Sequence, residues 1–203
     1  MIATTAIALR RRLRKARRAL RPAHRRDAER KLLQFARRLP EFRRARRVAA
    51  YLAVDGEMRA DGLLRWALRL GKTAFVPRLK PDATLSFVPW RPRSPMRKNR
   101  FGIAEPIAAL RLPPRRLDVV FVPLTGFDDH GNRLGMGGGF YDRSFAFRLG
   151  SGRWRRPRLI GLAFECQRVD ALPAQAWDAP LDGVLTEQGL RRFRRTTTSE
   201  DSL

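Results

Sequence analysis

Apolar residues follow one another in short runs in some parts of the chain and recur at helical spacing in others. Short continuous apolar runs are typical of buried strands, and positions three and four apart are typical of amphipathic helices. The runs predict strands at residues 47–54, 72–79, 85–88, 117–123, 159–164 and 183–186. The helical spacing predicts helices at residues 5–20, 23–39, 58–70 and 139–149. Pro22 separates the first two helices, and Pro77 is expected to end the second strand.

Helices and strands alternate along most of this predicted order, and the strands are apolar throughout. Such strands are buried on both faces, which is typical of a largely parallel sheet covered by helices. We therefore expect an α/β three-layer sandwich, with a basic helical segment at the N-terminus. Residues 1–190 are expected to form one domain, residues 89–100 an exposed loop, and residues 191–203 a flexible tail. In this architecture, ligands bind beyond the carboxyl ends of the strands.

Charge is the unusual feature of the composition, with a formal net charge of +25. Only five of the 44 basic residues are lysine, and residues 1–50 hold 18 basic side chains against three acidic ones. A basic segment can bind nucleic acid or acidic lipid, although a coding bias toward arginine explains the composition equally well. The segment has few aromatics for stacking on bases, so nucleic acid is not expected to be the main partner.

Location is constrained by cysteine content and by hydropathy. Cys166 is the single cysteine, which excludes an internal disulfide and favours a reducing compartment such as the cytoplasm. No apolar run is long enough to span a membrane, so no membrane partner is expected. The arginine-rich, acid-poor start also resembles a mitochondrial presequence, which stays an alternative.

Residues 133–143 read Arg-Leu-Gly-Met-Gly-Gly-Gly-Phe-Tyr-Asp-Arg and hold the strongest site signal. Glycines allow tight turns and close approach to a ligand, and backbone N–H groups at the start of a helix attract phosphate. Arg133 and Arg143 add forked donors for phosphate or carboxylate oxygens. The segment lacks the Gly-Lys-Ser/Thr ending of a P-loop and does not follow its strand directly, as a dinucleotide fingerprint does. A flexible turn is the structural alternative to a phosphate cradle.

Three carboxylates are candidates beside this loop. Asp142 and Asp178 together suit Mg²⁺, which takes one or two carboxylates, waters and substrate phosphates. Glu57 follows Asp55 and Gly56 at the end of a predicted strand, where a helix N-terminal charge explains it slightly better than a site role. No Ser-His-Asp or Cys-His arrangement suggests a nucleophile.

The motifs, taken in order, resemble those of the 5-formyltetrahydrofolate cyclo-ligase family, also called 5,10-methenyltetrahydrofolate synthetases. The resemblance runs from about residue 9 to residue 187 and includes the glycine loop. Its other motifs are Tyr-Leu-Ala-Val-Asp-Gly-Glu at 51–57, Val-Pro-Arg at 76–78, Gly-Ile-Ala-Glu-Pro at 102–106, Asp-Val-Val-Phe-Val-Pro-Leu-Thr-Gly-Phe-Asp at 118–128, Leu-Pro at 172–173 and Trp-Asp at 177–178.

This resemblance implies that 5-formyltetrahydrofolate and ATP are converted, with Mg²⁺, into 5,10-methenyltetrahydrofolate, ADP and phosphate. It also reverses the interpretation of Glu57, which would accept hydrogen bonds from the pterin ring. Arg133 would support the charge of the transferred phosphoryl group. The implied ATP-binding residues are Arg10, Arg133, Leu134, Gly135, Met136, Gly137, Gly138, Gly139, Phe140 and Tyr141. The implied substrate-binding residues are Leu52, Glu57, Met136, Gly137, Gly138, Gly139 and Phe140, and the implied metal ligands are Asp142 and Asp178.

The chain departs from the family pattern at three places. The N-terminal Lys-x-x-Leu-Arg motif aligns with its arginine at Arg10, the preferred register, which puts Ala6 at the lysine position. A second register puts the arginine at Arg14. Met136 and Phe140 replace residues more usual in the family, which bears on the folate side of the loop. The arginine excess raises the hypothesis that anionic polyglutamate tails of the folate bind more tightly than the monoglutamate. Two further alternatives are an arginine-rich nucleic-acid-binding module that keeps the fold without catalysis, and a sugar-phosphate or CoA enzyme of similar architecture.

Overall fold

The computed structural model describes residues 2–149 and 156–193, with the side chains of residues 2–5 left out. The α-helices are α1 (Ile2–Arg18), α2 (Pro22–Arg38), α3 (Pro40–Arg44), α4 (Asp61–Arg69) and α5 (Phe140–Phe145). Short 3-10 helices are η1 (Pro114–Arg116), η2 (Ala146–Arg148) and η3 (Glu165–Gln167). The strands are β1 (Arg47–Ala49), β2 (Thr73–Leu79), β3 (Leu85–Pro89), β4 (Met96–Lys98), β5 (Ala104–Pro106), β6 (Val119–Pro123), β7 (Gly126–Phe127), β8 (Arg133–Leu134), β9 (Arg158–Leu162), β10 (Gly183–Thr186) and β11 (Gly189–Arg192).

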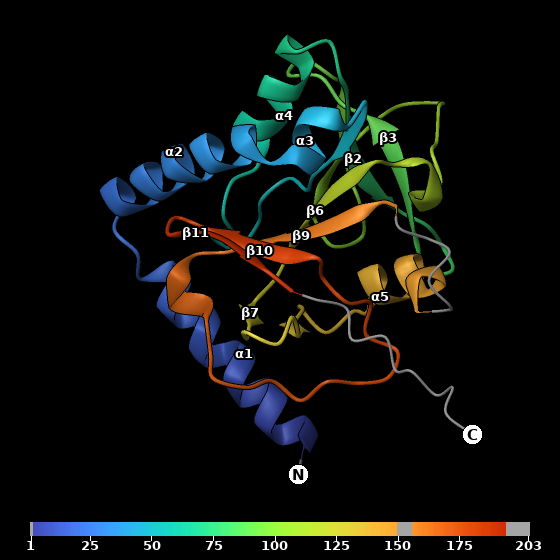
Figure 1. Ribbon diagram of the computed structural model, residues 1–203. Coiled ribbons are helices and arrows are strands. Elements are labelled where there is room, and N and C mark those ends of the chain that lie inside the picture. The colour runs from blue at the N-terminus through green and yellow to red at the C-terminus, as the bar shows by residue number, and fades with distance from the viewer. Residues whose placement is uncertain (1, 150–155, 194–203) are drawn as a thin grey trace, which may run out of the picture.

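A seven-stranded sheet in the order β11-β10-β9-β6-β1-β2-β3 forms the centre of the molecule (Figure 1). The strands from β10 to β2 in this order pair in parallel, and the two edge strands β11 and β3 pair antiparallel. The prediction of an α/β fold with a largely parallel sheet is therefore confirmed. The parallel strands are predominantly apolar in their centres, as expected of strands that helices or loops cover on both faces.

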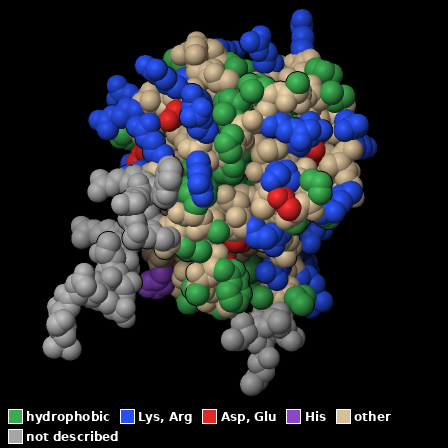
Figure 2. All heavy atoms as spheres, turned by 90° about the vertical axis from the view of Figure 1, so that its right-hand side faces the viewer, with side chains coloured by type: hydrophobic (Ala, Val, Ile, Leu, Met, Phe, Trp, Pro, Cys, Tyr) green, Lys and Arg blue, Asp and Glu red, His purple; other side chains and the backbone are tan. Residues whose placement is uncertain are grey.

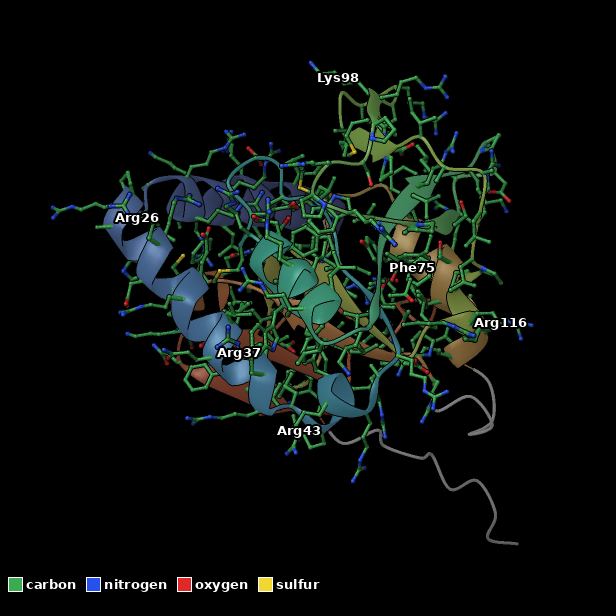
Figure 3. The ribbon with its side chains drawn as sticks, turned by 90° about the horizontal axis from the view of Figure 1, so that it is seen from above. Arg26, Arg37, Arg43, Phe75, Lys98 and Arg116 are labelled. Atoms are coloured by element: carbon green, nitrogen blue, oxygen red, sulfur yellow. The ribbon has the colours of Figure 1, made fainter. Side chains whose placement is uncertain are left out.

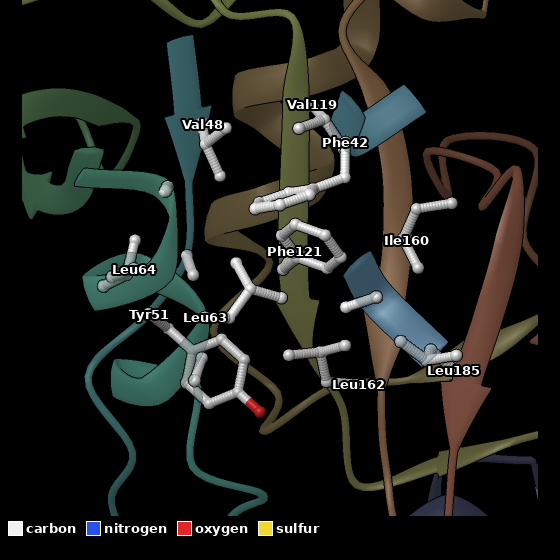
Figure 4. Close-up of a cluster of buried hydrophobic side chains, with 14 of the residues drawn as sticks. Phe42, Val48, Tyr51, Leu63, Leu64, Val119, Phe121, Ile160, Leu162 and Leu185 are labelled. Atoms are coloured by element: carbon white, nitrogen blue, oxygen red, sulfur yellow. The ribbon is translucent and has the colours of Figure 1, made fainter. Parts of the chain in front are cut away.

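Alternate residues of the strands face two separate hydrophobic clusters. In β6, Val119 and Phe121 belong to the cluster under α2, α3 and α4, whereas Val120 and Val122 belong to the cluster on the α5 side. Phe42 of α3 packs on Phe121 with ring centroids 6.2 Å apart, and Figure 4 shows this pair among the side chains of the first cluster. Full burial of one such phenylalanine stabilises the fold by about 1.5–3 kcal/mol. This strand alternation gives the three layers of the sandwich.

Helix α2 covers the sheet because its apolar residues share one face. Pro22 is at its first turn, where a missing N–H is tolerated, and Ala28, Leu32 and Ala36 are buried at intervals of four residues. Several of its charged side chains point outward, whereas Arg25 turns inward to the Gly56 and Arg17 carbonyls. Figure 3 shows Arg26 extending outward from α2, as Lys98 does from β4, while Phe75 of the sheet lies inside.

Several predicted boundaries were wrong, and each has a local physical reason. The first strand ends at Ala49 rather than residue 54, because the chain leaves the sheet after Ala50 to form the loop that precedes α4. Helix α4 begins at Asp61 rather than residue 58. Met58 lies outside the helix, where its carbonyl accepts a hydrogen bond from the Tyr51 hydroxyl at 2.6 Å.

Three further differences concern the end of β2 and two strands, β4 and β11, that were not predicted. Pro77 lies inside β2 and does not end it, because β2 pairs only with β3 beyond Phe75. The expected loop 89–100 contains β4, which pairs with β5 in a small separate hairpin whose β4 residues are all exposed. The expected tail begins inside β11, which pairs with β10, and residues 194–203 of that tail lie outside the described residues.

Candidate active site

The predicted motifs meet at the carboxyl edge of the parallel strands. Three loops project from this edge, residues 50–60 after β1, residues 124–139 after β6 and residues 163–182 after β9. Helix α1 runs along this edge, beside β7 in Figure 1, and contributes Leu13 to a small buried cluster with Leu134 and Leu172. The expectation that these sequence-distant motifs lie at one edge of the sheet is confirmed.

The glycine loop lies between a short hairpin and α5. Strands β7 and β8 pair antiparallel, and Asp128 holds the turn between them by accepting the backbone N–H groups of His130 and Asn132 at 3.0 and 2.9 Å. Gly137 has φ +100° and Gly139, at the N-cap of α5, has φ +62°. These angles favour glycine, because a Cβ strains a left-handed backbone. The predicted arrangement of loop followed by helix is present, although α5 ends at Phe145 and η2 replaces the rest of the expected helix.

Arg133 and Asp142 form a nearly buried ion pair behind the loop. Their side chains are 6% and 24% exposed, and Nη2 of Arg133 donates to Oδ1 of Asp142. The same Oδ1 accepts the backbone N–H of Ala179 at 3.1 Å, and Nη1 of Arg133 donates to the Ala179 carbonyl. The network thus joins the glycine loop and α5 to the loop that carries Asp178.

Asp142 and Asp178 retain acceptor oxygens that suit a hard cation. Oδ2 of Asp178 accepts the N–H of Gln175 at 3.0 Å, while Oδ1 of Asp178 and Oδ2 of Asp142 accept no hydrogen bond from the described residues. Burial raises the pKa of Asp178, and the negative charge of Asp142 adds to that rise. Nowhere in the described chain do three or more His, Cys, Asp or Glu residues gather into a metal site. A divalent ion at these two aspartates would have to take further ligands from a bound substrate and water.

Glu57 lies in a buried, electrostatically coupled group. Its side chain is only 6% exposed, and Oε2 accepts the backbone N–H of Val54 at 3.0 Å. Burial raises the pKa of Glu57. Burial, followed by the negative charge of Glu57, also raises the pKa values of Tyr51 and Tyr141. The predicted substrate residue and the predicted ATP residue Tyr141 are thus close enough to interact.

Leu52 and Glu57 also line an open hollow with about 510 Å³ of space for water. The other lining residues come from the same loop, from α2 and from the region around the start of α4, and none comes from the glycine loop. The structure therefore couples Glu57 to Tyr141 electrostatically without placing residues 136–140 in the same hollow.

The exposed part of the glycine loop carries Met136 and Phe140. Met136 is 50% exposed, and its sulfur lies 3.6 Å from the Thr125 hydroxyl. Phe140 makes an edge contact with Phe101 at 5.7 Å between centroids, and the Arg143 guanidinium lies 5.5 Å from the centre of the Phe140 ring. Phe101 is 55% exposed and comes from the hairpin that the sequence did not predict.

The contacts of α1 distinguish the two possible alignments of its arginine motif. Nε of Arg10 donates to the Gly135 carbonyl at 2.9 Å, whereas Nε of Arg14 donates to Oδ2 of Asp55 at 2.6 Å. Arg10 is therefore the arginine at the glycine loop. Sequence reasoning missed Arg17 and Asp55, which meet at this edge. The signal was the helical spacing of Arg10, Arg14 and Arg17, which puts all three on one face of α1.

Comparison with known proteins places this geometry among folate enzymes. Residues 3–187 match the sequence profile of the 5-formyltetrahydrofolate cyclo-ligase family. The 5-formyltetrahydrofolate cyclo-ligase of Haemophilus influenzae is 39% identical over 179 residues, covering 85% of this chain and 92% of the relative. The Escherichia coli K12 protein of the same name is 38% identical over 178 residues, covering 86% and 96%.

Solved structures agree with the sequence comparison. The 5,10-methenyltetrahydrofolate synthetase of Aquifex aeolicus superposes with a TM-score of 0.79 at 30% identity, covering 93% of both chains. The synthetase of Mycoplasma pneumoniae has a TM-score of 0.71 at 23% identity, covering 90% of this chain and 98% of its own, and supports the fold. Among the described residues, no helix has the length and apolar character needed to cross a bilayer.

Proposed function

The chain belongs to the 5-formyltetrahydrofolate cyclo-ligase family, and we propose that it converts 5-formyltetrahydrofolate and ATP into 5,10-methenyltetrahydrofolate, ADP and phosphate. The observation that carries this proposal is the family match over residues 3–187, which includes the glycine loop and Glu57. The alternative of a nucleic-acid-binding module without catalysis finds no support in these relatives. We further propose that residues 1–190 act as one catalytic domain.

The proposed reaction depends on how the two substrates are positioned rather than on a nucleophilic side chain. A formamide oxygen is a poor leaving group, so the γ-phosphoryl group of ATP is first transferred to it. N10 of the folate then attacks the activated carbon, the five-membered ring closes, and the bond to the phosphorylated oxygen breaks to release phosphate. Both reacting atoms of the closure belong to one ligand, so closure gains from proximity.

On the ATP side, backbone N–H groups of residues 135–139 would surround the phosphates. Arg10 lies at the Gly135 carbonyl, within reach of a phosphate bound there. Arg133 would support the charge in transfer. Two nitrogens of Arg133 each donate once in the structure, and a guanidinium has five N–H donors, so further donors remain for a ligand. Leu134 and Tyr141 complete this side.

On the folate side, Glu57 would accept hydrogen bonds from the pterin N–H groups, and Leu52 would contact the ring. Oε1 of Glu57 accepts no hydrogen bond from the described residues, which leaves one oxygen for the ligand. Residues 136–140 would touch the folate from the glycine loop. Phe101 and Phe140, whose rings meet edge to face beside the glycine loop, would give the folate an apolar surface to contact.

We also propose that Asp142 and Asp178 hold Mg²⁺ together with phosphate oxygens. When bound, the ion would neutralise negative charge on the phosphates during transfer. The donors fit, because each carboxylate keeps one oxygen without a hydrogen bond from the described residues and burial already disfavours the charge of Asp178.

Two finer proposals concern location and substrate form. The single cysteine agrees with a cytoplasmic location. On the face shown in Figure 2, Lys and Arg side chains are widely spread and acidic ones are few, which would favour polyglutamylated folate electrostatically. Comparing KM for mono- and polyglutamylated substrate tests this, and equal values count against it.

The activity is tested by incubating the purified protein with 5-formyltetrahydrofolate, Mg²⁺ and ATP while recording near-ultraviolet absorbance of the methenyl product. We expect the signal only when ATP is present. No signal in either case, from a folded protein, contradicts the proposal. A salt-sensitive nucleic-acid affinity in the same protein, without turnover, would favour the alternative.

A further inference from the structure

Asp55 binds helix α1 through three arginines. Oδ2 accepts Nε of Arg14 at 2.6 Å and Nη2 of Arg17 at 2.9 Å, and Oδ1 accepts Nη2 of Arg18. The Asp55 side chain is 12% exposed. Its backbone has φ +51°, which non-glycine residues rarely adopt but which Asp and Asn tolerate best. A strained, multiply paired residue between β1 and α4 indicates that its position is closely determined by its surroundings.

Arg17 is buried beside two carboxylates, Asp55, which it contacts directly, and Glu57, whose negative charge partly offsets the lowering of the Arg17 pKa by burial. The Arg17 side chain is fully buried, its Nε donates to the Asp55 carbonyl at 3.1 Å, and its Nη1 donates to the Leu124 carbonyl at 3.4 Å. Asp55 is the only carboxylate among the described residues that Arg17 contacts within salt-bridge distance. A guanidinium at this depth needs a paired anion, and Asp55 is the carboxylate that meets it by direct contact.

Apolar packing alone holds α1 weakly. Among residues 6–18 of α1, only Leu13 is a buried apolar residue, and it packs with Leu134 and Leu172 in a cluster that Ala6 and Leu9 flank. None of residues 6–18 belongs to either of the two large clusters around the sheet. The helix is therefore held largely by polar contacts, and those of Arg14, Arg17 and Arg18 with Asp55 are the most concentrated of them.

The rotation of α1 decides where Arg10 lies. Arg10, Arg14 and Arg17 share one face, and Arg10 is about 10 Å along the axis from Arg17 at 1.5 Å per residue. In this orientation of the helix the Nε of Arg10 lies 2.9 Å from the Gly135 carbonyl.

We propose that Asp55 is a positioning residue, which through the arginines of α1 places Arg10 at the glycine loop and so joins the folate-side loop to the ATP side. The role of Arg10 in ATP binding rests on the proposed function. The position of α1 does not depend on the proposed function, so it can be measured without ligand or turnover.

The test uses Asp55→Asn and Asp55→Gly in the full chain, since both residues tolerate the left-handed backbone and both remove the negative charge. We expect KM for ATP, and the Kd of a non-hydrolysable ATP analogue, to rise by about ten- to a hundredfold, because misplacing a binding group by an ångström has effects of that size. The matched control is Asp27→Asn, which removes an exposed carboxylate that pairs with Arg30 and Lys31 on α2. It should leave both constants unchanged.

Combining each Asp55 variant with Arg10→Ala distinguishes a misplaced Arg10 from a general loss of structure. If Asp55 acts through Arg10, Asp55→Asn adds little to the loss of analogue affinity that Arg10→Ala causes by itself. Additive losses of affinity in the double variant, or an unchanged Kd in the single Asp55 variants, overturn the proposal.

Two further measurements keep the test decisive. Should circular dichroism show that both Asp55 variants are unfolded, Arg18→Gln takes their place, because Arg18 is 58% exposed and its loss leaves Arg17 paired. A smaller loss of affinity that vanishes in the Arg10→Ala background supports the proposal, and an additive loss contradicts it.

Amide hydrogen exchange without ligand should be faster across α1 in the variants even if the wild-type protein shows no turnover, and unchanged exchange counts against the proposal.

Discussion

Replacing Asp142 should affect both stability and turnover, because its carboxylate takes part in two networks. In Asp142→Ala the oxygen that accepts Arg133 and the Ala179 N–H is lost. Both hydrogen bonds end on a charged carboxylate, and bonds of that kind contribute about 1.5–3 kcal/mol each, so we expect a loss of about 3–6 kcal/mol. For a chain of this length, 1 kcal/mol shifts Tm by about 2–4 °C, which gives a fall of about 6–24 °C.

Asp142→Asn separates the two roles of the side chain. Its amide oxygen still accepts both hydrogen bonds, so about half of the loss in stability is expected, whereas the charge needed at the proposed Mg²⁺ site disappears. Thermal unfolding without nucleotide measures the first effect, and methenyl formation at saturating folate measures the second. Asp27→Ala is the control, since exposed ion pairs on a helix surface contribute little to stability.

The outcomes that refute this reasoning differ for the two roles. An unchanged Tm in Asp142→Ala would show that the contacts with Arg133 and Ala179 do not stabilise the fold. Full turnover in a folded Asp142→Asn variant would remove Asp142 from the proposed metal site. Wild-type turnover with a lowered Tm would leave the carboxylate a purely structural role.

Three further predictions follow from the same site. Because burial raises the pKa of Glu57 above 4.5, this carboxyl contributes to stability below pH 4.5 and loses that contribution as the pH rises through its raised pKa. Glu57→Gln should therefore raise Tm at neutral pH and not near pH 4.5, while KM for folate increases; an equal Tm change at both pH values contradicts the sign. Gly137→Ala forces a Cβ onto φ +100°, at a strain of about 1–3 kcal/mol, and should weaken ATP binding more than folate binding, as separate KM measurements would show. Chelation by EDTA should abolish turnover, with recovery on adding Mg²⁺ and no change in Tm without nucleotide; turnover that persists after chelation argues against a metal at Asp142 and Asp178.

The sequence was least informative where contacts between distant residues decide the structure. The apolar run at residues 47–54 predicted one strand, yet β1 ends at Ala49 because the following residues are needed in the loop that holds Glu57. Strands β4 and β11 were missed because each pairs with a neighbour through backbone groups while most of its side chains remain outside the core. Backbone pairing of this kind leaves little trace in the pattern of apolar residues.

Arg17 shows the same limit at the level of one side chain. In the sequence it is one of many arginines in a basic helix, and nothing local marks it as buried. In the structure it is fully buried against Asp55. Charge and spacing are local properties, whereas burial depends on which loop lies over the helix.

By itself, the sequence determined the α/β class, the glycine loop, the meeting of the motifs at one sheet edge and, through its ordered motifs, the family. These features depend on the period of apolar residues, on the backbone freedom of glycine and on the rule that parallel strands end at a common edge. Tertiary structure alone decided that Arg10 rather than Arg14 lies at the loop, that Arg133 pairs with Asp142, and that Asp55 joins α1 to the folate-side loop. Those contacts bring together residues between nine and 125 positions apart, and only the packing of α1 and the loops across the sheet edge selects them.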